Sequence, residues 1–339
     1  MNKFLVYFIF CICSIPNFSM ASEEQPLYIE GNLAIKMIDK SGVKFISAKK
    51  MPYIIKGSRQ IEVDELFSGD IIGKLECSPL YSCSNRVTEY LSSLGIKNSE
   101  ALILYDNHYG IYASTLYSIL ESIGHKNLAI LNGGLDAVIN LDPNQKVYNK
   151  YSHELKKLLK KVDDENITVD KSNKVNDLKK KLDVLKLHLL TQSSRRDENI
   201  TVSRYTASGI HLDYLLSKKE LKKVVKKKRI NPQESNITIV DSCPLVDIVG
   251  SHNGNYELGV EPISWKYLID KELRKLKSKE ELERFFQEKK LDKKQNYYIY
   301  CMASSYKAFF MMSVMRELGY QNVKVFTGDW NHWEGDIDE

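Results

Sequence analysis

The stretch Asn296-Tyr-Tyr-Ile-Tyr-Cys301-Met-Ala-Ser-Ser-Tyr-Lys307-Ala308 decides how this chain of 339 residues folds. Residues 297–300 are aromatic or β-branched and predict a buried strand, whereas residues 308–318 are apolar at helical spacing and stop before Gly319. Cys301 therefore stands where a strand passes into a helix. Unpaired N–H groups at a helix N-terminus stabilise a thiolate, which makes a cysteine nucleophilic. A small buried hydrophobe is the alternative that the position alone leaves open.

The same pattern occurs 195 residues earlier in the chain. It begins at Tyr105-Asp106 and runs through an apolar stretch to Gly124 and Gly133. Adding 195 to positions of the first stretch gives, without a gap, Tyr300, Cys301, Ala308, Gly319, Asn322 and Gly328. This register predicts an internal duplication of a helix-strand-loop-helix-strand unit. Only the second copy has a thiol at the start of the loop, because the first copy has Asp106.

Three further segments carry a resemblance to a known family. Ala129-Ile-Leu-Asn-Gly-Gly134-Leu135-Asp-Ala137 follows the first strand-loop-helix unit, and Val325-Phe-Thr-Gly328-Asp-Trp330-Asn-His-Trp333 follows the second. Lys277-Ser278-Lys-Glu280-Glu281-Leu282 opens a helix that runs toward Leu291, with Ser278 and Glu281 spaced as a capping box. Together these segments resemble the tandem-domain rhodaneses, which are thiosulfate and 3-mercaptopyruvate sulfurtransferases.

The resemblance implies an α/β fold with two rhodanese-like modules, each a parallel sheet flanked by helices. It also implies that Cys301 carries a sulfane sulfur as a persulfide, that Asp106 is its inactive counterpart, and that a ring of loop N–H groups surrounds the sulfur. The expected substrate-binding loop comprises Met302, Ala303, Ser304, Ser305, Tyr306 and Lys307. Expected partners are a small anionic sulfur donor and a thiol or cyanide acceptor. No metal or organic cofactor is implied, and no ligand-spaced Cys/His set or nucleotide fingerprint occurs.

The chain departs from the family pattern at several positions. Cys243 replaces an arginine that helps to hold the donor, and residues 255–259 lack the family's histidine. Ser304 replaces a loop glycine, which predicts a backbone cost of about 1 kcal/mol if its φ is positive. Lys307 supplies the missing positive charge or points into solvent.

These departures motivate a second functional hypothesis. The protein is then a degenerate rhodanese-like binding or redox protein in which Cys243 and Cys301 form a reversible disulfide. A cysteine phosphatase is a third reading, but Lys307 stands where the phosphatase spacing needs an arginine, and lysine cannot make the same bidentate grip on phosphate.

The domain organisation follows from composition. Residues 1–21 combine Lys3, an apolar run and a Ser19-Met20-Ala21 site, which predicts a signal peptide and export to the periplasm or the exterior. The first, inactive module is expected over residues 22–146, a helical insert over 147–208, and the catalytic module over 209–339. In an oxidising compartment a disulfide between Cys77 and Cys83 competes with two free thiols.

The insert and the segment after it are strongly basic. Residues 147–230 contain 22 Lys and Arg against 11 Asp and Glu, a net charge of +11 in a chain whose total is +5. Helices are expected over 154–161 and 175–190, and another behind the capping box of Ser217 and Glu220. Such a segment suits an anionic surface or a protein partner, or is a solvated connector. Nucleic acid is disfavoured because no aromatics are interleaved with the charges.

His125 is expected in a surface turn.

Overall fold

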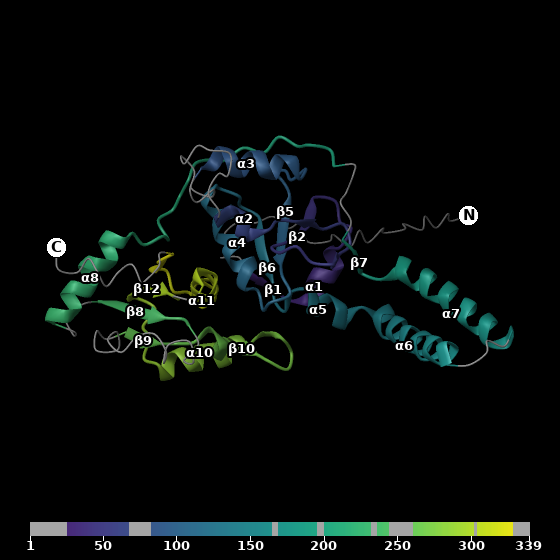
Figure 1. Ribbon diagram of the computed structural model, residues 1–339. Coiled ribbons are helices and arrows are strands. Elements are labelled where there is room, and N and C mark those ends of the chain that lie inside the picture. The colour runs from purple at the N-terminus through teal and green to yellow at the C-terminus, as the bar shows by residue number, and fades with distance from the viewer. Residues whose placement is uncertain are drawn as a thin grey trace, which may run out of the picture.

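The computed structural model describes residues 26–67, 83–164, 169–194, 200–231, 236–243, 260–301 and 304–327. The predicted signal peptide, Cys77, residues 255–259, Met302, Ala303, Trp330 and Trp333 lie outside these ranges. Within them the chain forms two parallel sheets side by side, with a pair of long helices projecting from the first (Figure 1). No helix in the described ranges is both long and apolar enough to span a bilayer. The predicted α/β class with two parallel sheets is confirmed.

The first sheet has five parallel strands in the order β1-β6-β5-β2-β4. The strands are β1 (Tyr28–Ile29), β2 (Val43–Ser47), β4 (Arg59–Gln60), β5 (Ala101–Tyr105) and β6 (Leu128–Leu131). One face packs on α2 (Val63–Phe67), α3 (Ser84–Ser93) and α4 (Ile111–Ser122), and the other on α1 (Gly31–Ala34), η1 (Ile35–Met37) and α5 (Gly134–Leu141). Both faces are therefore buried, which explains why the central strands are nearly continuous apolar runs.

The second sheet has four parallel strands in the order β13-β12-β8-β9. The strands are β8 (Ile237–Asp241), β9 (Val260–Pro262), β12 (Asn296–Tyr300) and β13 (Val323–Val325). The inner face packs on η5 (Trp265–Leu268), α10 (Lys279–Glu288) and α11 (Ser305–Glu317), and the outer face on α8 (Lys218–Ile230). A short hairpin of β10 (Ile269–Asp270) and β11 (Lys275–Leu276) precedes α10. Both predicted capping boxes are present, at the starts of α8 and α10.

The structure confirms the internal duplication. The bounds of α3 and α10 differ by 195 residues at both ends, and so do those of β5 and β12. Pairing of β2 with β5 in the first sheet also matches pairing of β8 with β12 in the second, with all strands parallel. Each module therefore presents the carboxyl ends of two adjacent central strands at one edge.

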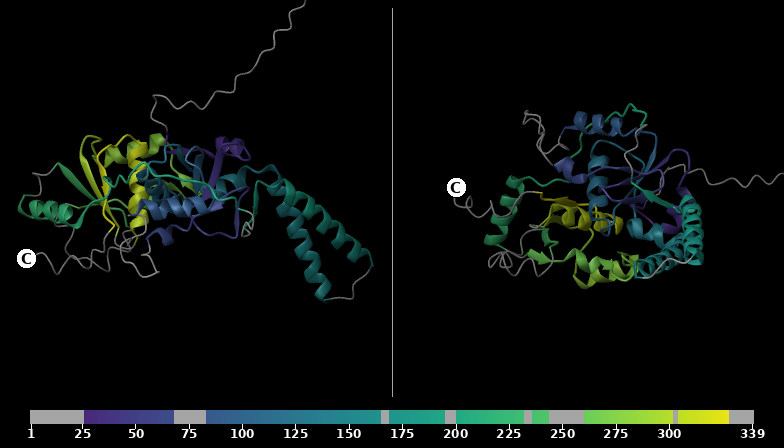
Figure 2. Two further views of the ribbon diagram at one scale, coloured as in Figure 1. Left: turned by 90° about the horizontal axis from the view of Figure 1, so that it is seen from above. Right: turned by 45° about the vertical axis from the view of Figure 1, so that its right-hand side comes forward.

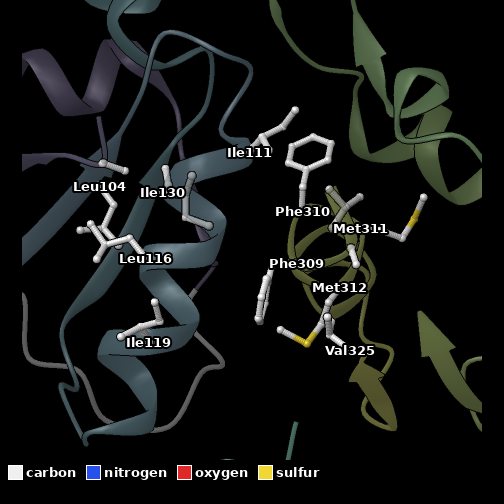
Figure 3. Packing of buried hydrophobic residues seen from close by; sticks show 14 of the residues in the cluster. Leu104, Ile111, Leu116, Ile119, Ile130, Phe309, Phe310, Met311, Met312 and Val325 are labelled. Atoms are coloured by element: carbon white, nitrogen blue, oxygen red, sulfur yellow. The ribbon is translucent and has the colours of Figure 1, made fainter. Parts of the chain in front are cut away.

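The two modules share one core. Phe309 and Phe310 of α11 face Leu116 and Ile119 of α4 across the interface, and both helices pack on their own sheets (Figure 3). At the solvent end of the same contact, both Nη atoms of Arg316 lie 2.7 Å from the carboxylate oxygens of Glu121. Glu121 and Arg316 are themselves 195 residues apart, so equivalent positions meet across the interface.

The insert projects from the first module as a helical hairpin. It consists of α6 (Pro143–Asp164) and α7 (Val169–His188), which lie side by side away from both sheets (Figures 1 and 2). Both helices are longer than predicted, and the expected boundary at residue 147 falls inside α6. The base of the hairpin is fixed, because β7 (Thr191–Ser193) pairs antiparallel with β3 (Tyr53–Ile55). The N–H of Leu190 also donates to Asp142 at 2.7 Å.

The prediction that His125 lies in a surface turn is wrong. Its side chain is 4% exposed, with Nδ1 2.7 Å from the hydroxyl of Tyr205 and Nε2 3.0 Å from the carbonyl of Glu100. Tyr320, at the matching position of the second module, is also buried, and its hydroxyl donates to the carbonyl of Leu291. Both modules therefore bury an aromatic ring at this position and provide a hydrogen-bond partner for its polar atoms. The residue types, histidine and tyrosine, did not indicate this burial.

The shared core predicts that Phe310 stabilises both modules together. Its side chain is fully buried, so Phe310→Ala should lower the free energy of unfolding by about 3 to 5 kcal/mol. Denaturant unfolding followed by tryptophan fluorescence measures the loss. Tyr53→Ala, at a side chain that is 60% exposed, is the matched control and should change the value by no more than about 0.5 kcal/mol. Equal small effects for both variants would contradict the shared core.

His125 predicts a pH dependence of stability. Burial lowers the pKa of His125, and its contact with Glu100 only partly offsets that effect. The unfolded chain, with a pKa of about 6.5, then binds the proton more readily than the folded protein. The free energy of unfolding should therefore fall as the pH drops through that value. His125→Gln should lose this part of the pH dependence, whereas the exposed His153→Gln should retain it in parallel denaturation series.

Candidate active site

The candidate site lies at the carboxyl edge of the second sheet, where β8 and β12 end beside each other. Their register pairs Asp241 with Tyr300, so the chain leaves both strands at the same level. Cys301 follows Tyr300 directly, and Cys243 lies two residues beyond Asp241. The Cα atoms of the two cysteines are 5.0 Å apart, and their sulfurs form a disulfide across 58 residues of sequence. This is the pairing that the second functional hypothesis from the sequence expects.

Hydrogen bonds fix the backbone on the Cys243 side of the pair. The N–H of Ser242 donates to the carbonyl of Tyr300 at 2.9 Å, which continues the strand pairing one residue beyond β8. The N–H of Cys243 donates to Oδ1 of Asp241, also at 2.9 Å. Cys243 is 3% exposed and Cys301 is 5% exposed. The disulfide is therefore shielded from water and lies just beyond the ends of two paired strands.

The first module shows what the equivalent loop does with an anion. Asp106, at the position of Cys301, is fully buried, and its carboxylate accepts four backbone hydrogen bonds. Oδ1 accepts from His108 at 2.7 Å and Gly110 at 2.9 Å. Oδ2 accepts from Tyr112 at 2.8 Å and Ala113 at 3.0 Å. We call these four N–H groups the amide cradle. The amide cradle stabilises the buried carboxylate with main-chain dipoles and the first turn of α4.

The amide cradle depends on an unusual backbone. Tyr109 has a φ of 62° and Gly110 a φ of 87°, so two successive residues take the left-handed conformation. On the other side of the loop, a Cβ added at Gly134 would lie 2.1 Å from the carbonyl oxygen of Asp106. Only glycine allows α5 to approach the loop this closely. The second glycine of the Gly133-Gly134 pair is therefore needed for the shape of the cradle.

The loop of the second module has a different arrangement in this disulfide form. The counterparts of three cradle amides are those of Ser305, Lys307 and Ala308, and the fourth lies outside the described residues. The N–H of Lys307 donates to the carbonyl of Ser304 at 3.1 Å, and the N–H of Ser304 donates to the carbonyl of Cys301 at 3.3 Å. The sulfur of Cys301 is bonded to Cys243 beside β8. At least one amide expected to face the sulfur therefore bonds to a carbonyl oxygen instead.

The expected strain at Ser304 is absent. Its φ is −173°, which is extended backbone that any residue adopts, and it serves as the N-cap residue of α11. Its counterpart in the first module is Tyr109, where φ is positive. The condition for that cost, a positive φ at Ser304, is therefore not met in this form, because α11 begins one residue earlier relative to the repeat than α4 does. Lys307 is half-buried on the first turn of α11, and both interpretations of its side chain stay predictions.

Tyr306 connects the loop to the first module. Its hydroxyl donates a hydrogen bond to Asp64, and its ring centre lies 5.2 Å from that of Tyr112. Partial burial of Asp64 opposes its charged form, but hydrogen bonds from Lys49 and Tyr306 outweigh that effect and lower the pKa of Asp64. Burial, followed by the hydrogen bond to Asp64, raises the pKa of Tyr306. The loop next to Cys301 is thus tied to a charged group on the other module.

Sequence reasoning missed the role of Lys49. Its Nζ lies 2.8 Å from Glu62 and 4.5 Å above the ring centre of Tyr112, and it also pairs with Asp64. Register shows that Lys49 is the first-module counterpart of Cys243, because each lies two residues beyond a paired strand end. β2 and β8 are 194 residues apart, whereas β5 and β12 are 195 apart. Adding 195 to Lys49 therefore does not lead to Cys243.

Other features of the described residues do not add to this site. A surface hollow of about 440 Å³ is lined by residues that include Asn296, Tyr298 and Arg316, at the opposite end of β12 from Cys301. The part of the chain that the structure describes contains no group of three or more histidine, cysteine or acidic side chains placed to hold a metal. Cys83 stands at the N-cap of α3, and its predicted partner Cys77 lies outside the described residues.

The amide cradle predicts a specific cost for removing the carboxylate of Asp106. Asp106→Ala leaves four buried N–H groups without their acceptor, so the free energy of unfolding should fall by about 3 kcal/mol or more. Added formate should restore part of the loss by filling the vacated position, which thermal unfolding with and without formate measures. Asp183→Ala, on the exposed face of α7, is the control and should respond to neither change. A formate effect equal in both variants would argue against the cradle.

No protein-family profile matches the chain, and no curated protein matches it. Solved structures do match. The 3-mercaptopyruvate sulfurtransferase SseA from Escherichia coli superposes with a TM-score of 0.61 at 15% identity, covering 90% of this chain and 99% of that one. A sulfur transferase subunit of yeast mitochondrial complex I gives 0.64 at 15% identity, covering 90% and 95%. The 3-mercaptopyruvate sulfurtransferase of Leishmania major gives 0.59 at 11% identity, covering 91% and 74%. Likeness at these identities establishes architecture, and the architecture is that of the two-domain rhodanese fold.

Proposed function

We propose that the protein is a sulfurtransferase that takes a sulfane sulfur from thiosulfate or 3-mercaptopyruvate onto Cys301 and passes it to a thiophilic acceptor. The observation that carries this proposal is the equivalence of Cys301 and Asp106. The amide cradle around Asp106 holds an anion, and Cys301 begins the equivalent loop of the second module. A persulfide anion on Cys301 needs the same kind of stabilisation as the carboxylate. The fold shared with sulfurtransferases supports the same conclusion.

The chemistry is a double displacement. The Cys301 thiolate attacks the outer sulfur of thiosulfate, the bond between the two donor sulfurs breaks, and the electron pair leaves with sulfite. With 3-mercaptopyruvate the carbon–sulfur bond breaks, and the leaving group is released as pyruvate after gaining a proton. In both cases Cys301 then carries one additional sulfur, which a thiol or cyanide removes in the second displacement. Helix α11 begins at Ser305, and the positive end of its dipole favours the anionic sulfur.

The disulfide adds a requirement to this scheme. Cys301 has no free thiolate while it is bonded to Cys243, so a reductant must open the bond before a donor can react. The disulfide form also has the N–H of Lys307 bonded to Ser304. Reduction frees the Cys301 sulfur from β8, so that it is able to enter the loop as the Asp106 carboxylate does. We propose that Ser304, Ser305, Tyr306 and Lys307 then contact the donor together with Met302 and Ala303.

A redox or binding role without turnover is the second candidate. The observation that favours it is the disulfide itself, because Cys243 occupies the position of a donor-binding arginine in the family that the sequence resembles. A protein with a cysteine in place of this arginine binds an anionic donor less tightly, and it is able to form a reversible disulfide with Cys301. In this reading the two modules serve as a scaffold for thiol–disulfide exchange with a partner.

Two further parts of the proposal concern location and partners. We place the protein in an exported compartment, which suits the predicted signal peptide and a buried disulfide. We assign the basic hairpin of α6 and α7 to an anionic surface or protein partner. The hairpin projects from the first module, away from both sheets (Figure 2).

The first displacement gives a direct test. Reduced protein, freed of reductant and mixed with excess 3-mercaptopyruvate or thiosulfate, should release about one equivalent of pyruvate or sulfite in a single rapid phase. Cys301→Ser should release none, and protein left oxidised should release none until it is reduced. A coupled dehydrogenase assay measures pyruvate. Wild-type release no faster than that of Cys301→Ser with either donor would leave the redox role as the better account.

A further inference from the structure

We propose that Cys243 is a second catalytic residue that resolves the Cys301 persulfide and releases its outer sulfur as sulfide. The disulfide in the structure is then the product of this step. The inference rests on the proposed function, because it needs the persulfide that the first displacement forms. It goes further in assigning the sulfur to free sulfide and in making the enzyme a dithiol that is oxidised once per turnover.

The geometry brings the two thiols together before any donor arrives. Cys243 and Cys301 follow adjacent paired strands, and their Cα atoms are 5.0 Å apart. The Ser242 N–H bond to Tyr300 and the Cys243 N–H bond to Asp241 fix the backbone beside Cys243. Neither of these two hydrogen bonds involves a cysteine sulfur, so we expect the Cα separation of Cys243 and Cys301 to persist after reduction. The Cys243 sulfur therefore stays within reach of Cys301.

The step balances without an external oxidant. The Cys243 thiolate attacks Sγ of Cys301, a bond forms between these two sulfurs, and the bond from Cys301 Sγ to the outer sulfur breaks. The electron pair leaves with the outer sulfur, which takes the proton of the Cys243 thiol and departs as hydrosulfide. The sulfane sulfur is reduced by two electrons, and the two cysteines are oxidised to the disulfide. A dithiol reductant then restores both thiols for the next turnover.

Burial favours the internal thiol over an external acceptor. In the disulfide form Cys301 is 5% exposed and Cys243 is 3% exposed, so an external thiol has to enter a buried site, whereas Cys243 is already beside Cys301. A positioned group acts at an effective concentration far above that of a small thiol in solution. We therefore expect Cys243 to attack the persulfide at least about a hundredfold faster than a small thiol does. The first module supports the assignment, since the counterparts of the pair are Lys49 and Asp106, neither of which undergoes thiol chemistry. Only the second module combines a sulfur acceptor with a resolving group.

The experiment follows the sulfur atom in a single turnover without added thiol. Reduced wild-type protein, Cys243→Ser and Cys243→Ala are each mixed with 3-mercaptopyruvate, and pyruvate, free sulfide and protein mass are measured. Wild type should release about one equivalent of sulfide and finish with Cys243 linked to Cys301, as peptide mapping identifies. Both variants should release pyruvate but form sulfide at least about a hundredfold more slowly, and should gain the mass of one sulfur at Cys301.

The outcomes separate this inference from the function on which it rests. Release of pyruvate by wild type, together with a stable persulfide on Cys301 and no sulfide, overturns the role of Cys243 and leaves the transferase intact. A persulfide that moves to Cys243 without sulfide release also overturns it, because attack then occurs at the outer sulfur. No pyruvate from wild type removes the function itself. The serine and alanine variants control for each other, since a folding defect in one is visible as lost pyruvate release.

Discussion

Parallel pairing of β8 with β12 is the constraint on which the site depends. In a parallel sheet the carboxyl ends of neighbouring strands meet at one edge, and residues just beyond them come together whatever their separation in sequence. Asp241 pairs with Tyr300, so the chain places a cysteine after each strand with a Cα separation of 5.0 Å. Both strands are buried on both faces, and their register cannot slip without moving apolar side chains into solvent.

The two modules place different chemical groups at this edge. In the first, the corresponding positions hold Lys49 and Asp106, and the amide cradle keeps the carboxylate buried and fully hydrogen-bonded. Unlike a disulfide, the carboxylate of Asp106 has no bond that reduction can break. In the second, the same two positions hold sulfur. A disulfide carries no charge at this buried site, and its reduction gives two thiols, of which Cys301 ionises in the proposed mechanism. The same architecture thus holds a carboxylate in the first module and a reducible pair of cysteines in the second.

Much of the fold was predictable from the sequence, because repeated spacing reports repeated structure. The 195-residue offset identified α3 and α10, β5 and β12, and the equivalence of Asp106 and Cys301, all of which the structure bears out. The exposure of His125 was misjudged for a physical reason, because burial depends on neighbours that lie far away in the chain. Tyr205, which contacts His125, comes 80 residues later. The link from Tyr306 to Asp64 spans 242 residues and has no local signal at all.

In the proposed function, the disulfide would couple the redox state of the site to its ability to bind an anion. In the first module the N–H of Tyr112 donates to the buried carboxylate, whereas its counterpart at Lys307 donates to the carbonyl of Ser304. A main-chain N–H has one proton and cannot serve both acceptors well, so the helix-start arrangement of the disulfide form competes with the cradle. In the proposed mechanism, reduction of the disulfide would allow an anionic Cys301 sulfur to accept hydrogen bonds from these amides. In the proposed mechanism, oxidation would therefore remove the Cys301 nucleophile and also part of the electrostatic environment that stabilises its anion.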